Sequence, residues 1–361
     1  MLVSDVTIEV RDITLARKGQ VDSTYWADVK LALDLNGPGE WSMSLPADDP
    51  VVVALATPGA GIVVSGPGGT LYSGPVESFA REQTPVDSAG MIAFQGVSDS
   101  ALLWDVLILP NPAQELDAQT SDYDVRTGKT ETLLHQLVNL NLGPGAIASQ
   151  RGTLAGLLTM GTNSARGATR TSRARFDTLG DQLATLAKLD NLGFRIVQVD
   201  NHLEFQTFAG VDRTGEVRFD LENDTLARIA YEVAAAPITD VAVAGQGEGA
   251  ARTIIIRNSV ASLASATAWG RRRKIFKDQR YTDVLAELQQ AGDEILADDG
   301  TAVARTQLIP TDAVGELQYG VDWSVGDLIA VVVNDSEVES FVTGALIAIS
   351  QSGVLVGARI G

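Results

Sequence analysis

Apolar and polar residues alternate in short runs through the first hundred residues, and turns containing Gly and Pro separate the runs. The segments DVTIEVRDITL and STYWADVKLALDL alternate in this way, and GIVVSGPGGTLYSGPVESFARE predicts a hairpin around a Gly/Pro turn. An alternation of period two places successive side chains on opposite faces of a strand. Short strands at this spacing favour a small β-barrel or a β-sandwich in this part of the chain.

The middle of the chain carries helical patterns instead. A helix is expected over about 130–140, and a second, amphipathic helix over about 177–193. Between them, residues 145–175 are rich in Gly, Ser, Thr and Arg, which predicts a long loop with little regular structure. The following segment FRIVQVDNHLEFQTF predicts a hairpin over the two-residue turn Asp200-Asn201.

Strand-like segments return from about Thr239, and one amphipathic helix over about 282–298 interrupts them. The stretch QYGVDWSVGDLIAVVVN, from Gln318 to Asn334, turns at Gly326-Asp327 and continues as an apolar strand. The outline is β, then α/β, then β again. The fold class is therefore α+β and mostly β.

One internal similarity links the two ends of the chain. The segments GIVVSGPGGTLYSGPVESF and GDLIAVVVNDSEVESFVTGALIAI share a layout in which an apolar strand, a polar turn and a second strand follow a Gly. The second strands carry the steps Tyr72-Ser73-Gly74 and, more loosely, residues 341–344. Two related barrels at the ends of the chain would produce this similarity, as would two unrelated hairpins.

The formal net charge is −19 at pH 7, and the chain contains no Cys. Such acidity argues against a duplex-binding protein, which needs a basic face to displace counterions. It fits general solubility or a surface that does not retain passing nucleic acid. The lack of Cys removes disulfides, thiolate metal sites and Cys nucleophiles. With no run of 18 apolar residues and no basic N-terminal region, we expect neither a membrane span nor signal-peptide export.

Two glycine-containing motifs resemble nucleotide sites without their required context. In VAVAGQGEGAAR the glycines follow a strand at dinucleotide-fingerprint spacing, but the β-branched segment ARTIIIRNS follows where a helix is needed. The segment TGKT has Tyr123 where a phosphate-binding loop needs Gly. A glycine-rich hairpin turn and a helix start are the favoured interpretations, so no nucleotide cofactor is expected.

Candidates for acid–base catalysis or metal binding are few. His135 lies on an expected helix and His202 beside a hairpin turn, and no His pair or calcium-loop motif has ligand spacing. We therefore expect no metal and no cofactor. With 46 acidic residues, the sequence leaves a glycosidase-type carboxylate pair open, although nothing singles one out.

Basic residues are concentrated in RRRKIFKDQR, residues 271–280. This segment could contact an acidic patch on a neighbouring subunit, or it could be a solvated linker into the following helix. The arginines of the 145–175 loop could likewise become ordered on a partner. The candidate interface residues are Arg271, Arg272, Arg273, Lys274, Arg166, Arg170 and Arg173.

The aromatic and turn residues before the last apolar strand suggest a structural role. Gly326 supplies a backbone that tolerates positive φ, and Asp327 can accept hydrogen bonds from nearby amides. We expect Tyr319 and Trp323 to close the end of a barrel; the alternative is a rim position that contacts a neighbour.

Several segments, in their order along nearly the whole chain, resemble the minor tail protein family of siphophages, the tail-tip or baseplate hub proteins. They are WSMSLP, YSGPVESF, TGKTETLLHQLVNLNLGPGA with its Arg-containing loop, RFDTLGDQLATLAKLDNLGFRIVQVDNHLEFQTF, VAVAGQGEGAAR, the Arg-rich entry to a helix, and YGVDWSVGDLIAVVV. The resemblance implies two small β-barrels at the chain ends with a mixed α/β insert between them. The expected boundaries are 1–105, 106–236 and 237–361, the last including the helix at about 282–298.

The resemblance also implies a non-enzymatic structural protein of the virion. Such a hub would form a homotrimeric ring with six barrels around its axis and join the hexameric tail tube to the distal adsorption apparatus. Its expected partners are itself, the distal tail protein, tail tube proteins, other tail-tip proteins and phage DNA in transit. The protein would be synthesised in the host cytoplasm. Two alternatives stay open: a tail-tip cell-wall or carbohydrate hydrolase, and a peripheral receptor-binding module.

Overall fold

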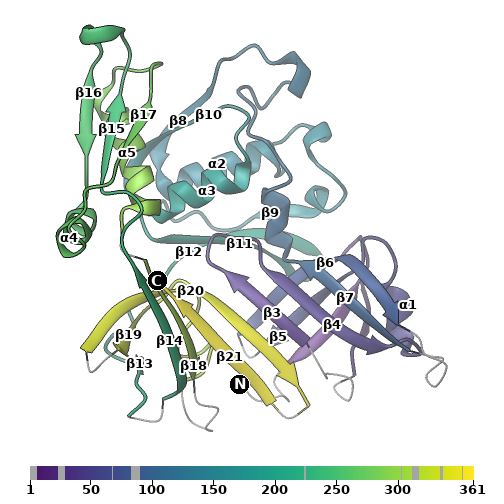
Figure 1. Cartoon of the computed structure of the whole chain (residues 1–361). Helices are drawn as coiled ribbons and strands as arrows, with labels where there is room; N and C mark the ends of the chain where they lie inside the picture. Colours follow the sequence, from purple (N-terminus) through teal and green to yellow (C-terminus); the bar gives the residue numbers. More distant parts are fainter. Residues whose placement is uncertain are drawn as a thin grey trace.

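The protein is represented by a computed structural model that describes residues 6–22, 29–66, 68–82, 90–222, 225–301, 303–310, 317–333, 336–351 and 353–361. Asn334 and residues 23–28, which the sequence places in strand-like stretches, lie outside the described residues. A large β-sheet occupies the lower half of Figure 1, and two smaller units lie above it.

The N-terminal β-region carries the alternation that its sequence predicts. Its elements are β1 (Thr7–Arg11), β2 (Arg17–Gln20), β3 (Val29–Asp34), β4 (Glu40–Pro46), α1 (Pro50–Leu55), β5 (Gly61–Gly66), β6 (Gly69–Glu82) and β7 (Met91–Val97). In β4, Trp41, Met43 and Leu45 are buried, whereas the residues between them are at least partly exposed. The short helix α1 begins after Asp49, whose side chain accepts a hydrogen bond from the Val51 amide.

The C-terminal β-region is built from strands that lie on both sides of a long interruption in the sequence. They are β13 (Arg218–Phe219), β14 (Leu226–Ala234), β18 (Val303–Pro310), β19 (Leu328–Val333), β20 (Ser336–Ser350) and β21 (Gly353–Ile360). Strand β14 pairs with β18 along its length, although the expected boundary at 236 assigns it to the insert. In β19 the central residues 329–331 are fully buried, as its apolar sequence predicts.

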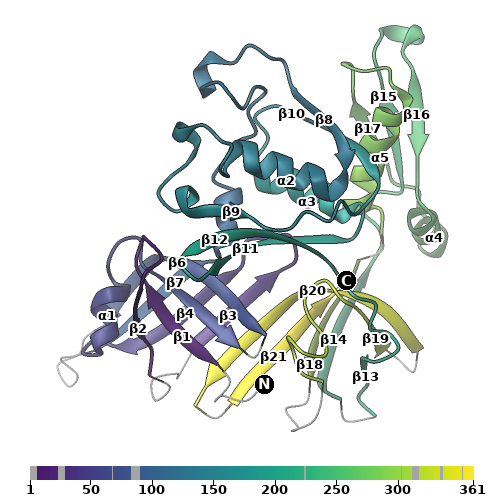
Figure 2. The same cartoon turned by 180° about the vertical axis from the view of Figure 1, so that it is seen from behind.

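The two β-regions form one continuous sheet. The strand order is β14-β18-β21-β20-β3-β4-β7-β6-β5-β1-β2, with β19 and β13 branching from β20, and 13 strands take part. The two regions meet where β20 pairs antiparallel with β3, and Figure 2 shows these strands side by side. The mostly β, α+β class is confirmed, but the pairing among the described strands is an open path and contains no closed barrel.

A single hydrophobic core extends through both β-regions. It contains buried residues from the N-terminal strands, such as Ile8 and Phe94, and from the C-terminal strands, such as Ile329 and Ile347. Because one core serves both ends of the chain, neither β-region buries its apolar face independently.

The first insert, residues 99–209, has its own core. It contains β8 (Asp124–Lys129), α2 (Thr130–Asn141), β9 (Leu158–Met160), β10 (Thr169–Ala174), α3 (Leu179–Lys188), β11 (Leu192–Val199) and β12 (His202–Ala209). The helices α2 and α3 pack on the β11-β12-β9 sheet, which lies between them and the large sheet in Figure 1.

The second insert, residues 240–299, interrupts the connection from β14 to β18. It contains β15 (Asp240–Ala244), β16 (Ile254–Arg257), α4 (Val260–Ala268), β17 (Lys274–Asp278) and α5 (Leu285–Asp299). The sheet order is β16-β15-β17, and α5 covers one face through Leu288 and Ala291 against Val241 and Val243. Among the described residues, no helix is long and apolar enough to cross a membrane.

The stronger helix predictions are confirmed, and two shorter helices are absent from them. Helices α2, α3 and α5 lie within a few residues of the expected positions, and Asp200 of the β11–β12 turn has the positive φ of a tight hairpin. Helices α1 and α4 were not expected. Helix α4 begins with a capping box between Ser259 and Ser262. Its sequence consists mostly of small residues and lacks a clear apolar period, so the sequence pattern does not predict it.

A buried ion pair joins the N-terminal β-region to the first insert. Arg11 of β1 donates to Asp99 at 2.5 and 2.9 Å, and both side chains are almost fully buried. Arg11 also donates to Gln198 of β11 at 2.9 Å, and Ser73 of β6 donates to Asp99 at 2.6 Å. These hydrogen bonds compensate the buried charges of Arg11 and Asp99 at the boundary between the N-terminal β-region and the first insert.

Replacement of Asp99 by Ala is expected to destabilise the protein by about 3–5 kcal/mol, because it leaves the Arg11 guanidinium buried without a counter-charge. Urea unfolding measures the loss. The matched control is Lys188→Ala, which removes a half-exposed pair with Asp298 and should cost about 0–1 kcal/mol. Equal effects of the two substitutions would contradict the role assigned to the buried pair.

Candidate assembly interface

The two β-regions repeat one arrangement of five strands. In the N-terminal region the path β3-β4-β7-β6-β5 links the strands in the order first, second, fifth, fourth, third along the chain. In the C-terminal region the path β14-β18-β21-β20-β19 follows the same order, and every neighbouring pair in both paths is antiparallel. We call these paths the N-terminal half and the C-terminal half.

The repeat extends to the register of individual residues. One row across the N-terminal half reads Lys30, Ser42, Gln95 and Ser78. The corresponding row across the C-terminal half reads Ala230, Gln307, Arg359 and Gly344. Ser78 and Gly344 each follow a bulge in the fourth strand, so the irregularity occupies the same place in both halves.

This register refines the similarity seen in the sequence. The two hairpins are present as β5–β6 and β19–β20. The bulges make Val76 equivalent to Val342, so the steps beginning at Tyr72 and Phe341 are not equivalent. The two halves are therefore related by the arrangement of their hairpins. The similar residue types at Tyr72 and Phe341 occupy different structural positions.

The halves are joined through the first strand of one and the fourth strand of the other. Six residue pairs connect β3 with β20, from Asp34 opposite Gly344 to Val29 opposite Ile349. The strand equivalent to β3 in the C-terminal half is β14. The segment equivalent to the paired part of β20 in the N-terminal half is residues 78–82 of β6. Their outer edges pair with no strand among the described residues.

The end of β6 is exposed in a way that its counterpart is not. All six residues 77–82 are exposed, and Phe79 retains 51% of its accessible surface although its ring lies 5.7 Å from that of Phe94. Ala345, which occupies the position equivalent to Phe79, is fully buried beside β3. The exposed edge and the exposed aromatic side chain therefore coincide.

A groove of about 640 Å³ follows the outer face of the sheet across the joint between β3 and β20. Lys30, Glu40, Glu77 and Arg359 provide charges of both signs along it, and Leu346 and Leu355 provide apolar surface. The lining of the groove is more apolar than polar, and its charged residues form no concentrated basic strip.

The residues expected to close the second barrel lie together in the core. Tyr319 and Trp323 are buried with ring centroids 5.0 Å apart, and Trp323 stands at 90° to Phe219 at 5.6 Å. Burial raises the pKa of Tyr319 to about 12. Gly326 has φ +98°, and Asp327 accepts hydrogen bonds from the amides of Val211 and Ser324 at 2.8 and 2.9 Å. This turn therefore also anchors the chain leaving the first insert.

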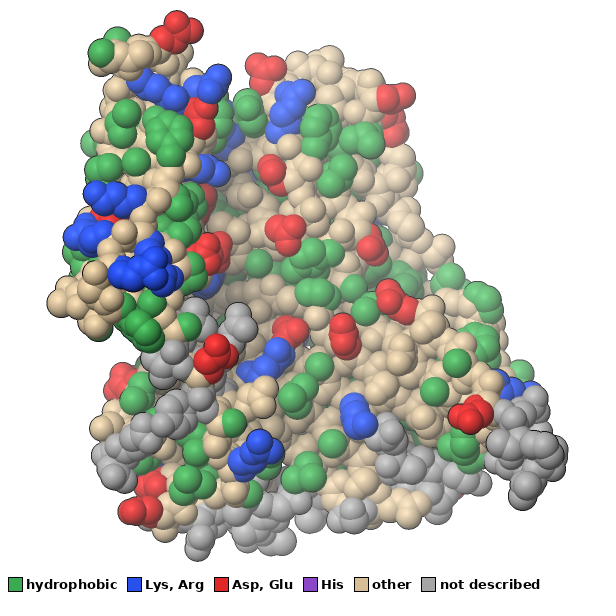
Figure 3. All heavy atoms as spheres, viewed as in Figure 1, with side chains coloured by type: hydrophobic (Ala, Val, Ile, Leu, Met, Phe, Trp, Pro, Cys, Tyr) green, Lys and Arg blue, Asp and Glu red, His purple; other side chains and the backbone are tan. Residues whose placement is uncertain are grey.

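The basic segment at 271–274 lies on the second insert and divides into two groups. Arg272 pairs with the buried carboxylate of Asp240, and Arg273 donates to the carbonyl of Ala236 at 3.0 Å. Arg271 and Lys274 are exposed and form no ion pair within the described part of the chain. Lys and Arg side chains gather on this insert at the upper left of Figure 3.

An apolar face accompanies these charges. Ile254, Ile256 and Phe276 are each more than half exposed on the side of the β16-β15-β17 sheet that α5 does not cover. Arg252 lies over the Phe276 ring at 5.8 Å. Exposed apolar side chains with a basic surrounding are typical of a protein contact surface.

The segment 145–175, expected to have little regular structure, contains β9 and β10. Its three candidate arginines have acidic partners within the chain; Arg170 and Arg173 lie on β10, and Arg166 precedes it. Arg166 donates to the buried carboxylate of Glu131 at 2.6 Å. Arg170 pairs with Asp190 at 2.9 Å. Arg173 lies beside the rings of Tyr123 and Tyr281, at 5.4 and 4.8 Å from their centroids, and contacts Glu287 of the second insert at 3.3 Å. These residues line a cleft of about 350 Å³ between the inserts. Arg166 and Arg170 thus fix this segment within the first insert, and Arg173 connects it to the second insert.

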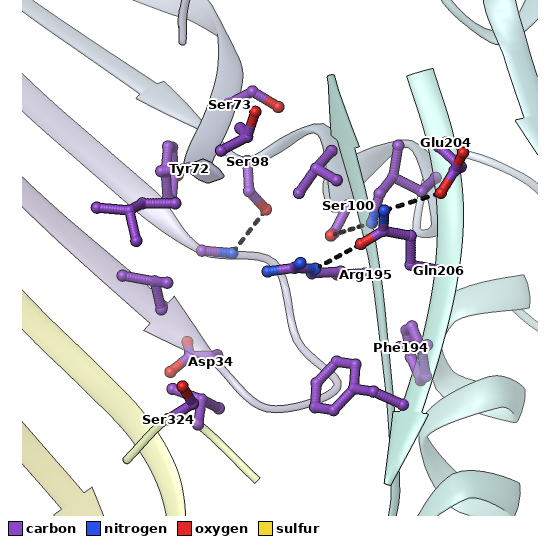
Figure 4. A pocket seen from close by; sticks show the side chains of 18 of the residues that line it. Asp34, Tyr72, Ser73, Ser98, Ser100, Phe194, Arg195, Glu204, Gln206 and Ser324 are labelled. Carbon is purple, nitrogen blue, oxygen red and sulfur yellow. Dashed lines mark hydrogen bonds between the residues drawn. The ribbon is translucent and has the colours of Figure 1, made fainter. Parts of the chain in front are cut away.

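A cavity of about 480 Å³ lies where both β-regions meet the first insert (Figure 4). Arg195 donates to Gln206 at 3.0 Å, and Gln206 in turn donates to Glu204 at 2.8 Å. The other carboxylate of the lining, Asp34, pairs with Arg359. Since both carboxylates are engaged and the described lining contains no His, the cavity lacks the recognisable acid–base pair of a hydrolase.

The two histidines have structural environments. His135 of α2 exchanges a hydrogen bond with Thr207 at 3.0 Å and packs edge-on against Phe205, and burial lowers its pKa. His202 begins β12 beside the hairpin turn.

No group of three His, Asp or Glu residues with metal-binding geometry occurs among the described residues. After Gly245 and Gly247 the chain continues as a short turn and strand β16, without the helix of a dinucleotide site.

The pair of Arg272 and Asp240 predicts a specific acid response. Hydrogen bonding to Arg272 lowers the pKa of Asp240 from 3.8 to about 2. A folded-state pKa below the unfolded value contributes stability above about pH 4 that is lost as the pH falls through about 2. Arg272→Ala should therefore lower the thermal midpoint at neutral pH, and its difference from the native protein should shrink between pH 4 and 2.

The matched control is Arg271→Ala, which removes an equal charge without an acidic partner. Thermal unfolding followed across this pH range measures both variants. A pH-independent effect of Arg272→Ala, or the same effect for both substitutions, would contradict the assignment.

Comparisons with known proteins agree with this architecture. A family model described as Siphovirus ReqiPepy6 Gp37-like protein matches residues 7–361. A search of curated proteins finds no match. The resemblance to siphophage tail proteins in the sequence is confirmed by the family match and by the solved structures that share the fold.

Three of these structures cover nearly the whole chain. The 43 kDa tail protein of prophage MuSo2 from Shewanella oneidensis has a TM-score of 0.60 at 12% identity, covering 99% of this chain and 98% of that chain. The prophage tail protein gp18 from Listeria monocytogenes EGD-e has 0.58 at 10%, covering 98% and 94%. The tail protein from Neisseria meningitidis MC58 has 0.57 at 14%, covering 99% and 96%. Because the family match extends over nearly the whole chain, the protein belongs to the siphovirus ReqiPepy6 Gp37-like family.

Proposed function

We propose that this protein is a structural, non-enzymatic component of a siphovirus tail, and that it forms the hub of the tail tip. Membership of the siphovirus family and the fold shared with three phage tail proteins support a tail component. The engaged carboxylates of the central cavity are consistent with a structural role.

The repeat of two halves within one chain is the observation that carries the hub proposal. Two equivalent halves per chain allow three chains to present six similar units around an axis. Such a ring matches a tail tube of sixfold symmetry while containing only three subunits. In this ring the two halves take the places of the two small barrels, and contacts between unlike edges close it.

The charge of the protein suits a conduit for DNA. With a net charge of −19, the ring would repel passing DNA on average, and the groove across the sheet lacks the basic strip that retains a duplex. We place the sheet face that bears this groove toward the axis of the ring.

The second insert is the proposed contact with neighbouring tail proteins. Arg271 and Lys274 offer exposed charge, without an ion pair among the described residues, beside the exposed apolar residues Ile254, Ile256 and Phe276. The partners are the distal tail protein, tail tube proteins and other tail-tip proteins, so that the hub joins the tube to the adsorption apparatus of the virion. Arg173 acts here indirectly, because it contacts Glu287 of the second insert, whereas Arg166 and Arg170 stabilise the first insert internally.

An epitope inserted at Gly249 tests the location. This residue lies in an exposed turn of the second insert with no atom within 4 Å of an added Cβ. We expect antibody label on the tail axis at the distal end of the virion, and threefold symmetry for this protein in a tail-tip reconstruction.

Label at the periphery of the tip would contradict the hub and support a receptor-binding module. A symmetry that is neither threefold nor sixfold would contradict the ring. Lysis of host cell walls by the purified protein, abolished by substitution of a carboxylate, would instead support a hydrolase.

A further inference from the structure

The end of β6, the fourth strand of the N-terminal half, and β14, the first strand of the C-terminal half, each have one edge that pairs with no described strand. Their counterparts, β20 and β3, pair with each other inside the chain. We infer that residues 78–82 of β6 pair antiparallel with β14 of a second copy of this chain. The inference deepens the proposed hub ring, on which it rests, by assigning its subunit contact to named strands in one register.

The intramolecular joint supplies the geometry. At that joint β20 adds to the outer edge of β3, and the residues on the core-facing side become buried, among them Leu31 and Ile347. Equivalent strands in the two halves have the same order, the same direction and the same bulge. The joint can therefore be repeated between copies with one edge from each half.

The register follows from the aligned rows. Ala348 lies opposite Lys30, and it is four residues beyond Gly344. Glu82 is likewise four residues beyond Ser78, and Ala230 is the counterpart of Lys30. The joint between copies therefore places Ala230 opposite Glu82. Two residues further along β14, Glu232 lies opposite Ala80, and the next pair on the same face joins Ala234 to Ser78.

The occupant is a second copy because the two edges are unlike and lie far apart in one molecule. Six strands separate β14 from β6 in the order of the large sheet, and Figures 1 and 2 both show the two strands well apart. An edge that pairs with a different edge of the next copy gives a head-to-tail contact, the type of contact from which closed rings of identical subunits are built. The exposed Phe79 supports this assignment, since its counterpart Ala345 is buried by the equivalent joint.

The lack of Cys in the chain allows a direct test of the register. Four single-cysteine variants are made: Ala80→Cys, Ser78→Cys, Glu232→Cys and Ala234→Cys. They are mixed in pairs in concentrated solution and oxidised, and covalent dimers are measured on non-reducing gels. Directly opposite residues have Cα atoms about 4.5–5.5 Å apart, within the range of a disulfide.

We expect covalent dimers when A80C is mixed with E232C and when S78C is mixed with A234C. The crossed mixtures, S78C with E232C and A80C with A234C, use the same four proteins in a register displaced by two residues, about 7 Å. Their dimer yield should be at least tenfold lower. Equal yields, or higher yields in the crossed mixtures, would overturn the register. Concentrated protein that forms neither oligomer nor disulfide would overturn the pairing itself.

A second measurement addresses the contribution of Phe79. Phe79→Ser should reduce the dimer yield of the A80C and E232C mixture several-fold, because it removes apolar surface that only the second copy covers. Leu355→Ser, at an equally exposed position on β21, is the control and should leave the yield unchanged. Thermal midpoints measured for both variants identify any loss caused by misfolding. Equal yields for the two variants would contradict the burial of Phe79 between copies.

The outcomes separate this inference from the proposed function. Label at the tail axis together with failed or crossed disulfides would leave the hub in place and reject the strand pairing. The expected disulfides in a protein that is absent from the tail would confirm the pairing and reject the hub.

Discussion

The pairing of β20 with β3 is the constraint on which the rest of the structure depends. It joins residues 344–349 to residues 29–34 and so brings strands from the two ends of the chain into one sheet. The apolar faces of both regions then bury each other in a continuous core. Such a contact has a large loop-closure cost, and it forms only when the intervening parts fold without obstructing it. The two inserts meet this requirement because each has a hydrophobic core of its own.

The first insert is fixed to the sheet by polar contacts, in addition to the packing of Leu15, between β1 and β2, into its core. Asn36, in the turn after β3, accepts a hydrogen bond from the Phe194 amide at 2.9 Å and donates to the Leu192 carbonyl at 2.8 Å. The network around Arg11 and Asp99 performs the same role from β1. Hydrogen bonds of this kind depend on direction and so define the orientation of a unit, whereas apolar contact alone permits sliding. Between the two inserts, Gln290 exchanges two hydrogen bonds with the backbone of Thr171.

Local patterns in the sequence predict the elements of this fold well and their partners poorly. Leu179, Leu183, Leu186 and Ala187 indicate the buried face of α3, and Gly326 indicates a turn, because both signals act within a few residues. The placement of β14 in the insert follows from its position in the chain, whereas its pairing with β18 crosses the entire second insert. The burial of Arg11 depends on Asp99 and Gln198, which are 88 and 187 residues away, so no local pattern reports it. The loop arginines show the same limit, since composition reveals their charge and only the fold reveals their acidic partners.

The repeat gives a reason for the unpaired edges of β6 and β14 among the described strands: each edge is equivalent to one that is paired inside the chain. An exposed edge is normally blocked by charge, proline or a covering segment, because it can pair with any other chain. Here β6 ends in charged residues on either side of Phe79, which disfavours indiscriminate pairing but leaves the backbone groups accessible. A partner with the register of β14 satisfies those groups and covers the aromatic ring at once. The same chain therefore contains both the joint that completes its own sheet and the two edges from which that joint can be repeated.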